Sequence, residues 1–499
     1  MTNEPTDLPQ HLYRAAEVRA LDGVAIKKHH ISGVTLMERA GAATFNVLKN
    51  IWPDAKRIKV VCGSGNNGGD GYVIARLMHE AGLEVHALHV SPLDQLEGDA
   101  KEAAEKLIAA GVKPEKYAAG KLEHSDLIVD ALLGTGLDRE ITGEMKNIIE
   151  DINTSGIPVL SIDIPSGLHA DTGRIMGSVV TAEATVTFIG LKRGLFTGQG
   201  PACSGETYFN DLNVPPDIYK DIKPSALRID LKNQLQLLPK RSRSAHKGDF
   251  GHALIIGGDL GYAGAARMAA EAAGRIGAGL VSLATRNQHA VHISTARPVI
   301  MAHAVEQSAQ LSGLLQRATV IAIGPGLGQS EWSLMLLAKV LETRLPLVVD
   351  ADALNLLAQE PVRNDRWILT PHPGEAARLL NCTSTEIQQD RFAAVQELQQ
   401  RYGGVIVLKG SGTLVIDPAG NVAVCSDGNP GMATGGMGDV LTGVIAGLLA
   451  QGLNPVAAAR LGVCVHAAAG DEAAKAGERG MLATDLMPWL RRLANIPRN

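Results

Sequence analysis

The sequence predicts an α/β protein of two domains, and three observations support this. Short apolar runs alternate with helical patterns along the chain. Glycine-rich loops follow many of these runs, as is usual where a strand of a parallel sheet turns into a helix. A polar stretch with Pro224 and Pro239 interrupts the alternation, and 499 residues suit two to four domains at about 150 residues each.

The first half predicts a βαβ series, and therefore a parallel sheet between two layers of helices. A helix is expected over Tyr72–Ala81, after a glycine loop. The expected strands are Ile58–Cys62, Glu84–Val90, Leu127–Leu132, Val159–Ile164 and Thr185–Ile189.

The alternation fades after Tyr219, and we place the domain boundary in the polar stretch 222–240. The expected domains are residues 1–225 and 226–499. The charge run Lys240–Lys247 is interpreted as a solvated linker rather than a nucleic-acid-binding segment.

The second half begins a new α/β series at His252, with a helix over Ala263–Ile276 and a last long helix after GGMGD. The two halves of the chain show no shared repeat period, which favours two separate domains over a duplication. Further buried strands are expected at Leu280–Ala284, Val320–Ile323, Leu347–Val349, Trp367–Leu369 and Val405–Leu408.

Composition excludes several classes of function. With 47 basic and 52 acidic residues, neither a nucleic acid nor a membrane surface is expected as the main partner. No run of about 18 apolar residues predicts a membrane span. The N-terminus lacks a signal-peptide pattern, and five scattered cysteines show no zinc or redox spacing. We therefore expect a cytoplasmic protein in a reducing compartment.

The first glycine loop, VVCGSGNNGGDGYV, has the dinucleotide-binding spacing at Gly63, Gly65 and Gly68. The acidic residue that holds the ribose in dehydrogenases is missing, because the second strand ends in HVSP. Redox use of a nicotinamide cofactor is therefore disfavoured. Asn67 and Asp70 instead offer oxygen atoms for a hard cation or a hydroxylated ligand.

Two further aspartates follow expected strands, Asp130 in VDALLGTG and Asp163 in SIDIPSG. Because the carboxyl ends of parallel strands line one crevice, these loops and NNGGD should converge there. Each aspartate taken singly suits a turn cap, whereas three such loops at one edge favour a site.

In this order, NNGGDG, VDALLGTG and IDIPSG resemble the YjeF N-terminal domain, the Rossmann-like NAD(P)H-hydrate epimerase, over residues 10–220. The resemblance implies that Asp163 faces the nicotinamide ring and moves a proton during epimerisation at C6. It implies a substrate phosphate held by Asn66, Asn67, Gly68, Gly69 and Asp70, a second wall at Gly134, Thr135, Gly136, Leu137, Asp138, Arg139 and Glu140, and a potassium ion near Asn67, Asp130 and Ser166.

The strongest chemical motif of the second half is NPGMATGGMGD, Asn429–Asp439, before an apolar helix. Its backbone N–H groups suit an anion, and Asp439 suits a base for a hydroxyl that attacks a phosphate. A helix cap is the alternative role for Asp439. The loop KGSGT, Lys409–Thr413, follows a buried strand and suits an adenine nucleotide. His372, between two prolines in TPHPGE, favours ligand contact over a structural role.

These motifs, with GGDLGYAGAA and GPGLG, resemble the YjeF C-terminal domain, the ribokinase-like NAD(P)H-hydrate dehydratase, over residues 240–492. The resemblance implies ADP as the phosphate donor, with Mg²⁺ bridging its oxygens. It implies nucleotide contacts from Lys409, Gly410, Ser411, Gly412, Thr413 and Gly438, and contacts to the hydrate from Ala265, Gly326, His372 and Asp439.

The sequence thus predicts a bifunctional enzyme that repairs hydrated NADH and NADPH, and a homo-oligomer is expected. Phosphorylation of the C6 hydroxyl would make it a good leaving group, which explains a kinase-type site in a dehydratase. One alternative is an ATP-dependent small-molecule kinase fused to a nucleotide-binding module. A second is a first domain that binds nucleotides without catalysis, although Asp130 and Asp163 argue against it.

Overall fold

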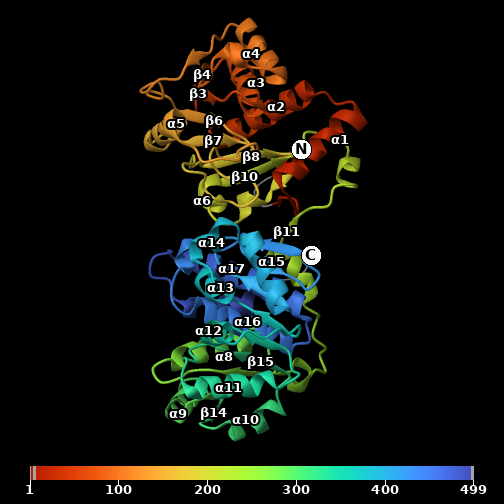
Figure 1. Ribbon diagram of the computed structural model, residues 1–499, viewed down its shortest axis with the longest axis vertical. Coiled ribbons are helices and arrows are strands. Elements are labelled where there is room, and N and C mark those ends of the chain that lie inside the picture. Colours follow the sequence, from red (N-terminus) through yellow and green to blue (C-terminus); the bar gives the residue numbers. More distant parts are fainter. Residues whose placement is uncertain (1, 4–6, 496–499) are drawn as a thin grey trace. The chain divides into compact units, whose positions relative to one another are not determined.

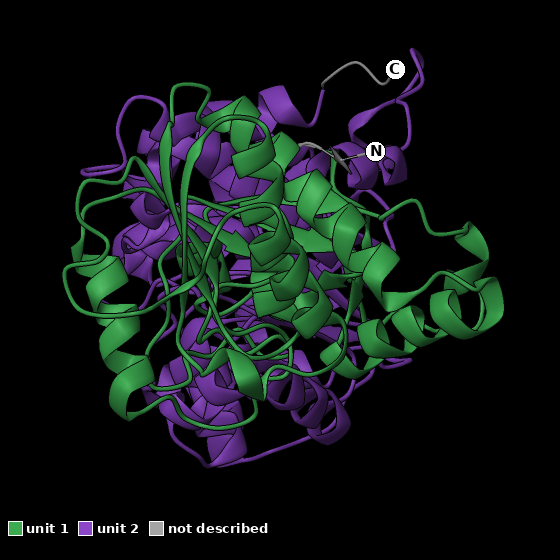
Figure 2. Cartoon of the chain, turned by 90° about the horizontal axis from the view of Figure 1, so that it is seen from above, with its two compact units in different colours: residues 1–228 green, residues 229–499 purple. Residues whose placement is uncertain are grey.

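The computed structural model describes residues 2–3 and 7–495. These residues form two compact units, residues 1–228 (unit 1) and residues 229–499 (unit 2), which Figure 2 colours separately. Both units alternate helices and strands, so the predicted α/β class is confirmed. Within the described ranges, no helix combines the length and the apolar character that crossing a bilayer requires.

Unit 1 is built on a mainly parallel sheet (Figure 1). Its strands are β1 (Thr2–Asn3), β3 (Arg57–Cys62), β4 (Glu84–His89), β5 (Glu115–Lys116), β6 (Leu127–Ala131), β7 (Val159–Ile162), β8 (Ala184–Phe188) and β10 (Glu206–Asn210). They lie in the order β1-β10-β8-β7-β6-β3-β4-β5, and only β1 runs antiparallel to its neighbour. A small group beside it joins β2 (His11–Tyr13) to β9 (Leu191–Lys192) and β11 (Ala226–Arg228).

Helices cover both faces of this sheet. They are α1 (Ala15–His29), α2 (Gly33–Ile51), α3 (Asn66–Glu80), α4 (Gly98–Ala109), α5 (Gly143–Thr154) and α6 (Gly200–Ser204). Alternate strand residues point to opposite faces, so Val60 and Val129 pack with the cluster that contains α2, α3 and α4. Val61 and Ile128 instead pack with the isoleucines of α5. The three-layer arrangement predicted for this domain is therefore confirmed.

Unit 2 has a sheet that is parallel over most of its width (Figure 1). Its strands are β12 (His252–Ile256), β13 (Leu280–Thr285), β14 (Met301–Ala304), β15 (Val320–Ile323), β16 (Leu347–Val349), β17 (Trp367–Leu369), β18 (Val405–Leu408), β19 (Thr413–Ile416) and β20 (Val422–Cys425). In the order β14-β13-β12-β15-β16-β17-β18 all neighbours are parallel, and β19 and β20 follow in antiparallel orientation.

The helices of unit 2 pack on both sides of that sheet. They are α7 (Leu231–Gln234), α8 (Ala263–Ile276), α9 (Asn287–Ala296), α10 (Ser308–Leu315), α11 (Glu331–Leu341), α12 (Ala351–Gln359), α13 (Pro373–Leu380), α14 (Ser384–Gln389), α15 (Arg391–Tyr402), α16 (Met437–Ala450), α17 (Pro455–Ala474) and α18 (Met487–Leu493). One face buries an alanine-rich core in which α8 and α16 lie against each other and against β12.

Two predicted boundaries in unit 1 are wrong. Helix α3 begins at Asn66 rather than Tyr72, so NNGGD forms its first turns. A side chain on Gly69 would strike Met37 of α2, and the close packing that glycine permits outweighs its low helix propensity. Strand β7 ends at Ile162 rather than Ile164, because Asp163 adopts a left-handed conformation with φ of 66°.

The contact between α8 and α16 makes a testable prediction about stability. A Cβ atom on Gly443 of α16 would lie 2.0 Å from the Ala269 backbone oxygen of α8. We expect Gly443→Ala to destabilise unit 2 by about 1–3 kcal/mol through overpacking. A gain of about 1 kcal/mol in helix propensity offsets part of this loss, so we expect a net destabilisation of up to about 2 kcal/mol.

The measurement is calorimetric unfolding of the full chain, with limited proteolysis and mass analysis to assign the weakened transition to unit 2. Gly313→Ala in α10 is the matched control, because a Cβ there meets no atom within 4 Å. Equal stability of the two variants would contradict the packing argument.

Candidate active sites

A cavity of about 550 Å³ lies in unit 1 beside the carboxyl ends of β3 and β6. The chain places β4 on one side of β3 and β6 on the other, and doubly wound sheets bind ligands at such a change of direction. The cavity is lined by Asn66, Asn67 and Asp70 of α3, by residues 132–139 after β6 and by Asp163 after β7. The three loops expected to converge therefore meet here.

Some residues expected in this site lie outside the cavity lining. Gly68 and Gly69 are buried within the first turns of α3. Glu140 is exposed and its carboxylate pairs with Arg174 at 3.2 Å. Asp130 and Ser166 are fully buried below the cavity lining.

The Asp130 carboxylate is saturated with hydrogen bonds. Ser166 donates through its hydroxyl at 2.6 Å and its backbone N–H at 2.9 Å. The Ser161 hydroxyl and the Leu132 N–H supply the other two bonds, at 2.8 and 3.2 Å. Burial raises the pKa of Asp130, and these donors oppose the rise. Asp130 thereby fixes the loop that carries Ser166 beneath the cavity.

Asn67 differs from Asp130 in its hydrogen bonding. Its side chain is only 8% exposed, yet neither its Oδ1 nor its Nδ2 has a hydrogen-bond partner in the described part of the chain. Gly134 lies directly opposite, where an added Cβ would be 3.5 Å from Asn67 Oδ1. A buried amide without partners costs free energy, so this side chain is suited to bind a ligand.

Asp163 forms a buried ion pair with Lys192 of β9. The Lys192 side chain is 1% exposed, and its Nζ also donates to Thr187 Oγ1 and the Phe188 carbonyl, both at 3.1 Å. These contacts fix the position of the ammonium group, and with it the Asp163 carboxylate. Lys192 was not predicted, although its place in the apolar stretch FIGLKRGLF is a signal of a buried, paired charge.

In unit 2, the ends of β16 and β18 bring Asp350 and Lys409 together. Lys409 Nζ lies 2.7 Å from Asp350 Oδ1 and 3.7 Å from Glu375 Oε2. Burial alone would lower the pKa of Lys409, but these carboxylates outweigh it and raise that pKa. The Thr442 hydroxyl of α16 donates to the other Asp350 oxygen at 2.7 Å. Asp350, which was not predicted, thus ties Lys409 to α16.

Asp439 lies in the first turn of α16, as predicted. Burial raises its pKa to about 7, the Asp350 carboxylate adds to the rise, and Lys409 opposes it. An added Cβ on the adjacent Gly438 would lie 3.1 Å from Lys409 Nζ, so the start of α16 faces the ammonium group. A carboxyl group that titrates near neutral pH beside a fixed cation is suited to proton transfer.

His372 has a structural role at the start of α13. Its Nδ1 accepts a hydrogen bond from Gly374 N at 2.9 Å, while Glu375 Oε2 accepts one from His372 N at 2.8 Å. Burial lowers the pKa of His372, and Lys409 adds to this, which keeps the ring neutral for capping. Its Nε2 lies 3.4 Å from Glu375 Oε1, and half of the side chain remains exposed.

A buried arginine supports the loop Lys409–Thr413. Arg391 is 1% exposed, and its guanidinium donates to the carbonyls of Leu408, Lys409 and Gly412 at 3.2 to 3.3 Å. The loop backbone is therefore held from below. The sequence did not predict this role, because Arg391 begins a helix far from the motif.

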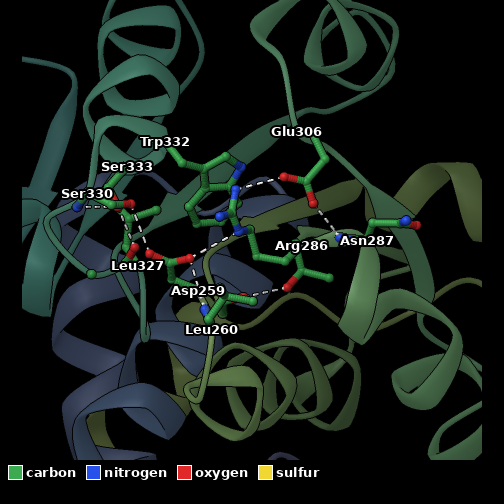
Figure 3. Close-up of polar contacts among 12 residues, drawn as sticks. Asp259, Leu260, Arg286, Asn287, Glu306, Leu327, Ser330, Trp332 and Ser333 are labelled. Atoms are coloured by element: carbon green, nitrogen blue, oxygen red, sulfur yellow. Dashed lines mark hydrogen bonds and ion pairs between the residues drawn. The ribbon is translucent and has the colours of Figure 1, made fainter.

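Ala265 and Gly326 lie side by side, since an added Cβ on Gly326 would be 3.1 Å from Ala265 Cβ. A polar network braces the neighbouring loops (Figure 3). Arg286 bridges Asp259 at 3.1 Å and Glu306 at 2.7 Å, with its guanidinium 5.0 Å from the Trp332 ring centroid. The Ser330 hydroxyl donates to the second Asp259 oxygen at 2.9 Å. The loops after β12, β13, β14 and β15 are thereby linked.

In comparison with known proteins, two different families match the two halves of the chain. Residues 33–194 match the family described as YjeF-related protein N-terminus, and residues 253–492 match the family described as NAD(P)H-hydrate dehydratase. A crystal structure of a ribokinase-like superfamily protein from Enterococcus faecalis V583 is 33% identical, with a TM-score of 0.50, and covers 54% of this chain and 95% of that one. The ribokinase-like fold predicted for the second half is confirmed.

Two relatives match along almost the whole length. The bifunctional NAD(P)H-hydrate repair enzyme of Coxiella burnetii is 49% identical over 97% of this chain and 99% of its own. That of Escherichia coli K12 is 44% identical over 99% of this chain and 96% of its own. The chain therefore belongs to the family of bifunctional NAD(P)H-hydrate repair enzymes.

Proposed function

We propose that this chain repairs hydrated NADH and NADPH in two steps. The domain at residues 1–225 interconverts the R and S epimers at C6. The domain at residues 226–499 dehydrates the S epimer at the expense of ADP, which yields NAD(P)H, AMP and phosphate. The observation that carries this proposal is the position of Asp439 in the first turn of α16, whose start faces Lys409. Burial also raises the pKa of Asp439 to about 7.

The dehydration proceeds through a phosphate ester. Asp439 takes the proton of the C6 hydroxyl, whose oxygen attacks the terminal phosphorus of ADP and releases AMP. The ring nitrogen then expels phosphate from C6, and loss of a proton from C5 forms the double bond. Lys409 and the backbone N–H groups before Asp439 stabilise the charge on the phosphoryl group.

The remaining residues of this domain bind the two substrates. Residues 409–413 and Gly438 hold the adenine nucleotide, and Ala265, Gly326 and His372 contact the hydrate. In the described part of the chain no three His, Cys, Asp or Glu side chains form a metal site. This fits Mg²⁺ that is held mainly by nucleotide oxygens and water. Magnesium, when bound, neutralises phosphate charge.

In the first domain, residues 66–70 and 134–140 hold the hydrate while Asp163 moves a proton at C6. The bound potassium ion would supply positive charge near the substrate phosphate. Asn67 Oδ1 fits this role because it is buried without a partner. Asp130 has all its hydrogen bonds satisfied, and with Ser166 it supplies the negative and polar surroundings that such a cation needs.

We further propose a cytoplasmic location and a homo-oligomeric state. All five cysteines, Cys62, Cys203, Cys382, Cys425 and Cys464, are free thiols, which suits a reducing compartment. Sedimentation analysis of the purified chain tests the oligomeric state.

The decisive test of the function is incubation of the full chain with ADP and hydrated NADH, followed by mass analysis. We expect NADH, AMP and phosphate in equal amounts. A stable phosphorylated product would instead support a small-molecule kinase. No conversion of the R epimer in the presence of excess ADP would indicate a first domain that only binds.

The role of Asp439 predicts a loss of activity with a defined pH dependence. Because the base must be ionised, kcat/KM for dehydration should rise as pH increases through about 7 and level off above it. Asp439→Asn should lower kcat by roughly 100-fold or more and remove this rise. Nucleotide affinity, measured by calorimetric titration, should change little. A loss of only a few-fold would exclude Asp439 as the base.

Potassium should be required by the first activity alone. Replacing K⁺ with tetramethylammonium should slow the interconversion of epimers, because a large organic cation cannot approach Asn67 Oδ1. Dehydration of the pure S epimer should be unaffected, and Asn67→Ala should abolish the potassium dependence. An equal decline of both activities would show that the cation site is placed wrongly.

A further inference from the structure

A second carboxyl group faces Asp163 in the cavity of unit 1. Asp22 of α1 lines this cavity together with Asp70, Asp163 and Lys192. Its carboxyl makes no hydrogen bond and no ion pair with any residue of the described ranges. By contrast, Glu17 on the same helix accepts a hydrogen bond from Arg14 N at 2.8 Å and pairs with the Arg14 guanidinium. Asp22 is therefore positioned toward the space that the substrate would occupy.

Burial of Asp22 favours its neutral form, whereas the charges around it act in both directions. Burial raises its pKa to about 6, with Asp163 adding to the rise while Lys192 and Arg19 oppose it. Asp70, on α3, is also shifted upward by burial and by Asp163 and Asp22, so its pKa lies well above the usual range. Tyr219 is a further titratable neighbour, and burial raises the pKa of its phenol, which leaves it uncharged. The cavity lining also contains the charged residues Asp99, Asp138 and Arg139.

One ammonium group thus faces three carboxyl groups. Lys192 contacts Asp163 directly and fixes the position of its carboxylate. Asp22 has no such contact, and burial raises its pKa. The cavity lining therefore contains a carboxylate fixed by a lysine and a second carboxyl group whose pKa is raised, a combination that can provide a base and an acid in one site.

Epimerisation at C6 of a hydrated dihydronicotinamide needs both an acid and a base. The ring nitrogen donates its lone pair to form an N1=C6 double bond while the C6–O bond breaks. The departing oxygen must receive a proton, because hydroxide is a poor leaving group. Water then attacks C6 from the opposite face and must lose a proton. No oxidant or further reactant is needed, and one water is released for each water added.

We propose that Asp22 is a second catalytic carboxyl of the epimerase, which donates a proton to the oxygen leaving C6 while Asp163 accepts one from the attacking water. After one turnover Asp22 is ionised and Asp163 is protonated. That protonation state is the one needed to convert the opposite epimer, so Asp22 and Asp163 together serve epimerisation in both directions. Proton exchange with solvent through the open cavity restores the initial protonation state. This inference rests on the proposed epimerase activity of unit 1.

The test is Asp22→Asn in the full chain, with the interconversion of pure R and pure S hydrate followed by chromatography. We expect kcat to fall roughly 100-fold or more in both directions, the size of a lost proton transfer, with KM changed only a few-fold. In the unaltered chain the rate should decline as pH rises through about 6, and this decline should vanish in the variant. Asp22→Glu should restore part of the rate and the decline.

Two controls separate catalysis from folding. Glu17→Gln removes a carboxylate from the same helix while its amide oxygen can still accept the Arg14 N–H bond, so it should interconvert epimers normally. Binding of the hydrate to Asp22→Asn, measured by equilibrium dialysis, should remain within a few-fold of the unaltered chain.

Several results would overturn the proposal: a variant rate within a few-fold of normal, an unchanged pH profile, or a loss of hydrate binding as large as the loss of rate. Failure of the unaltered chain to interconvert epimers at all would instead refute the proposed function. The two failures are thus distinguishable.

Discussion

Both candidate sites depend on a buried lysine paired with an aspartate that follows a parallel strand. Lys192 pairs with Asp163 in unit 1, and Lys409 pairs with Asp350 in unit 2. An unpaired ammonium at such depth would cost several kcal/mol, so each pair can persist only with its partner in place. The pairing fixes two charged groups at the sheet edge where ligands of α/β proteins bind.

Other carboxyl groups in these sites lack a direct contact with the lysine, and burial raises their pKa. In unit 2 the ammonium is committed to Asp350, and Asp439 is left with the cost of burial and with repulsion from Asp350. In unit 1 the Lys192 ammonium is paired with Asp163. Asp22, like Asp439 in unit 2, is left with the cost of burial and with repulsion from the paired aspartate. In each site one carboxylate is therefore paired with the lysine while another carboxyl group has a raised pKa, although the two folds have different strand orders.

Sequence patterns predict what is local, and the sites also depend on contacts between distant segments. The expected strand Val320–Ile323 and helix Ala263–Ile276 match the structure residue for residue, because each reflects periodic burial within one segment. The NNGGD segment is recognisable because two consecutive glycines are unusual within a helix. Arg391 and Asp350 were not predicted, since their partners lie 18 and 59 residues away along the chain. Their burial becomes visible only when the strands are placed side by side.

The geometry of the second site also explains why one activity needs the other. Asp439 is fixed by α16, the nucleotide loop is held by Arg391, and the loops around Ala265 are braced by Arg286. A rigid site presents its base and its phosphate donor from fixed directions, so only one configuration at C6 can direct its hydroxyl toward both. Free water can approach C6 from either face of the ring, so both epimers can form without an enzyme. A rigid dehydratase would leave the other epimer in place, and a second site that tolerates attack on either face of C6 removes the limitation. A rigid dehydratase site that accepts one epimer and an epimerase site that allows attack on both faces of C6 therefore complement each other on a single substrate.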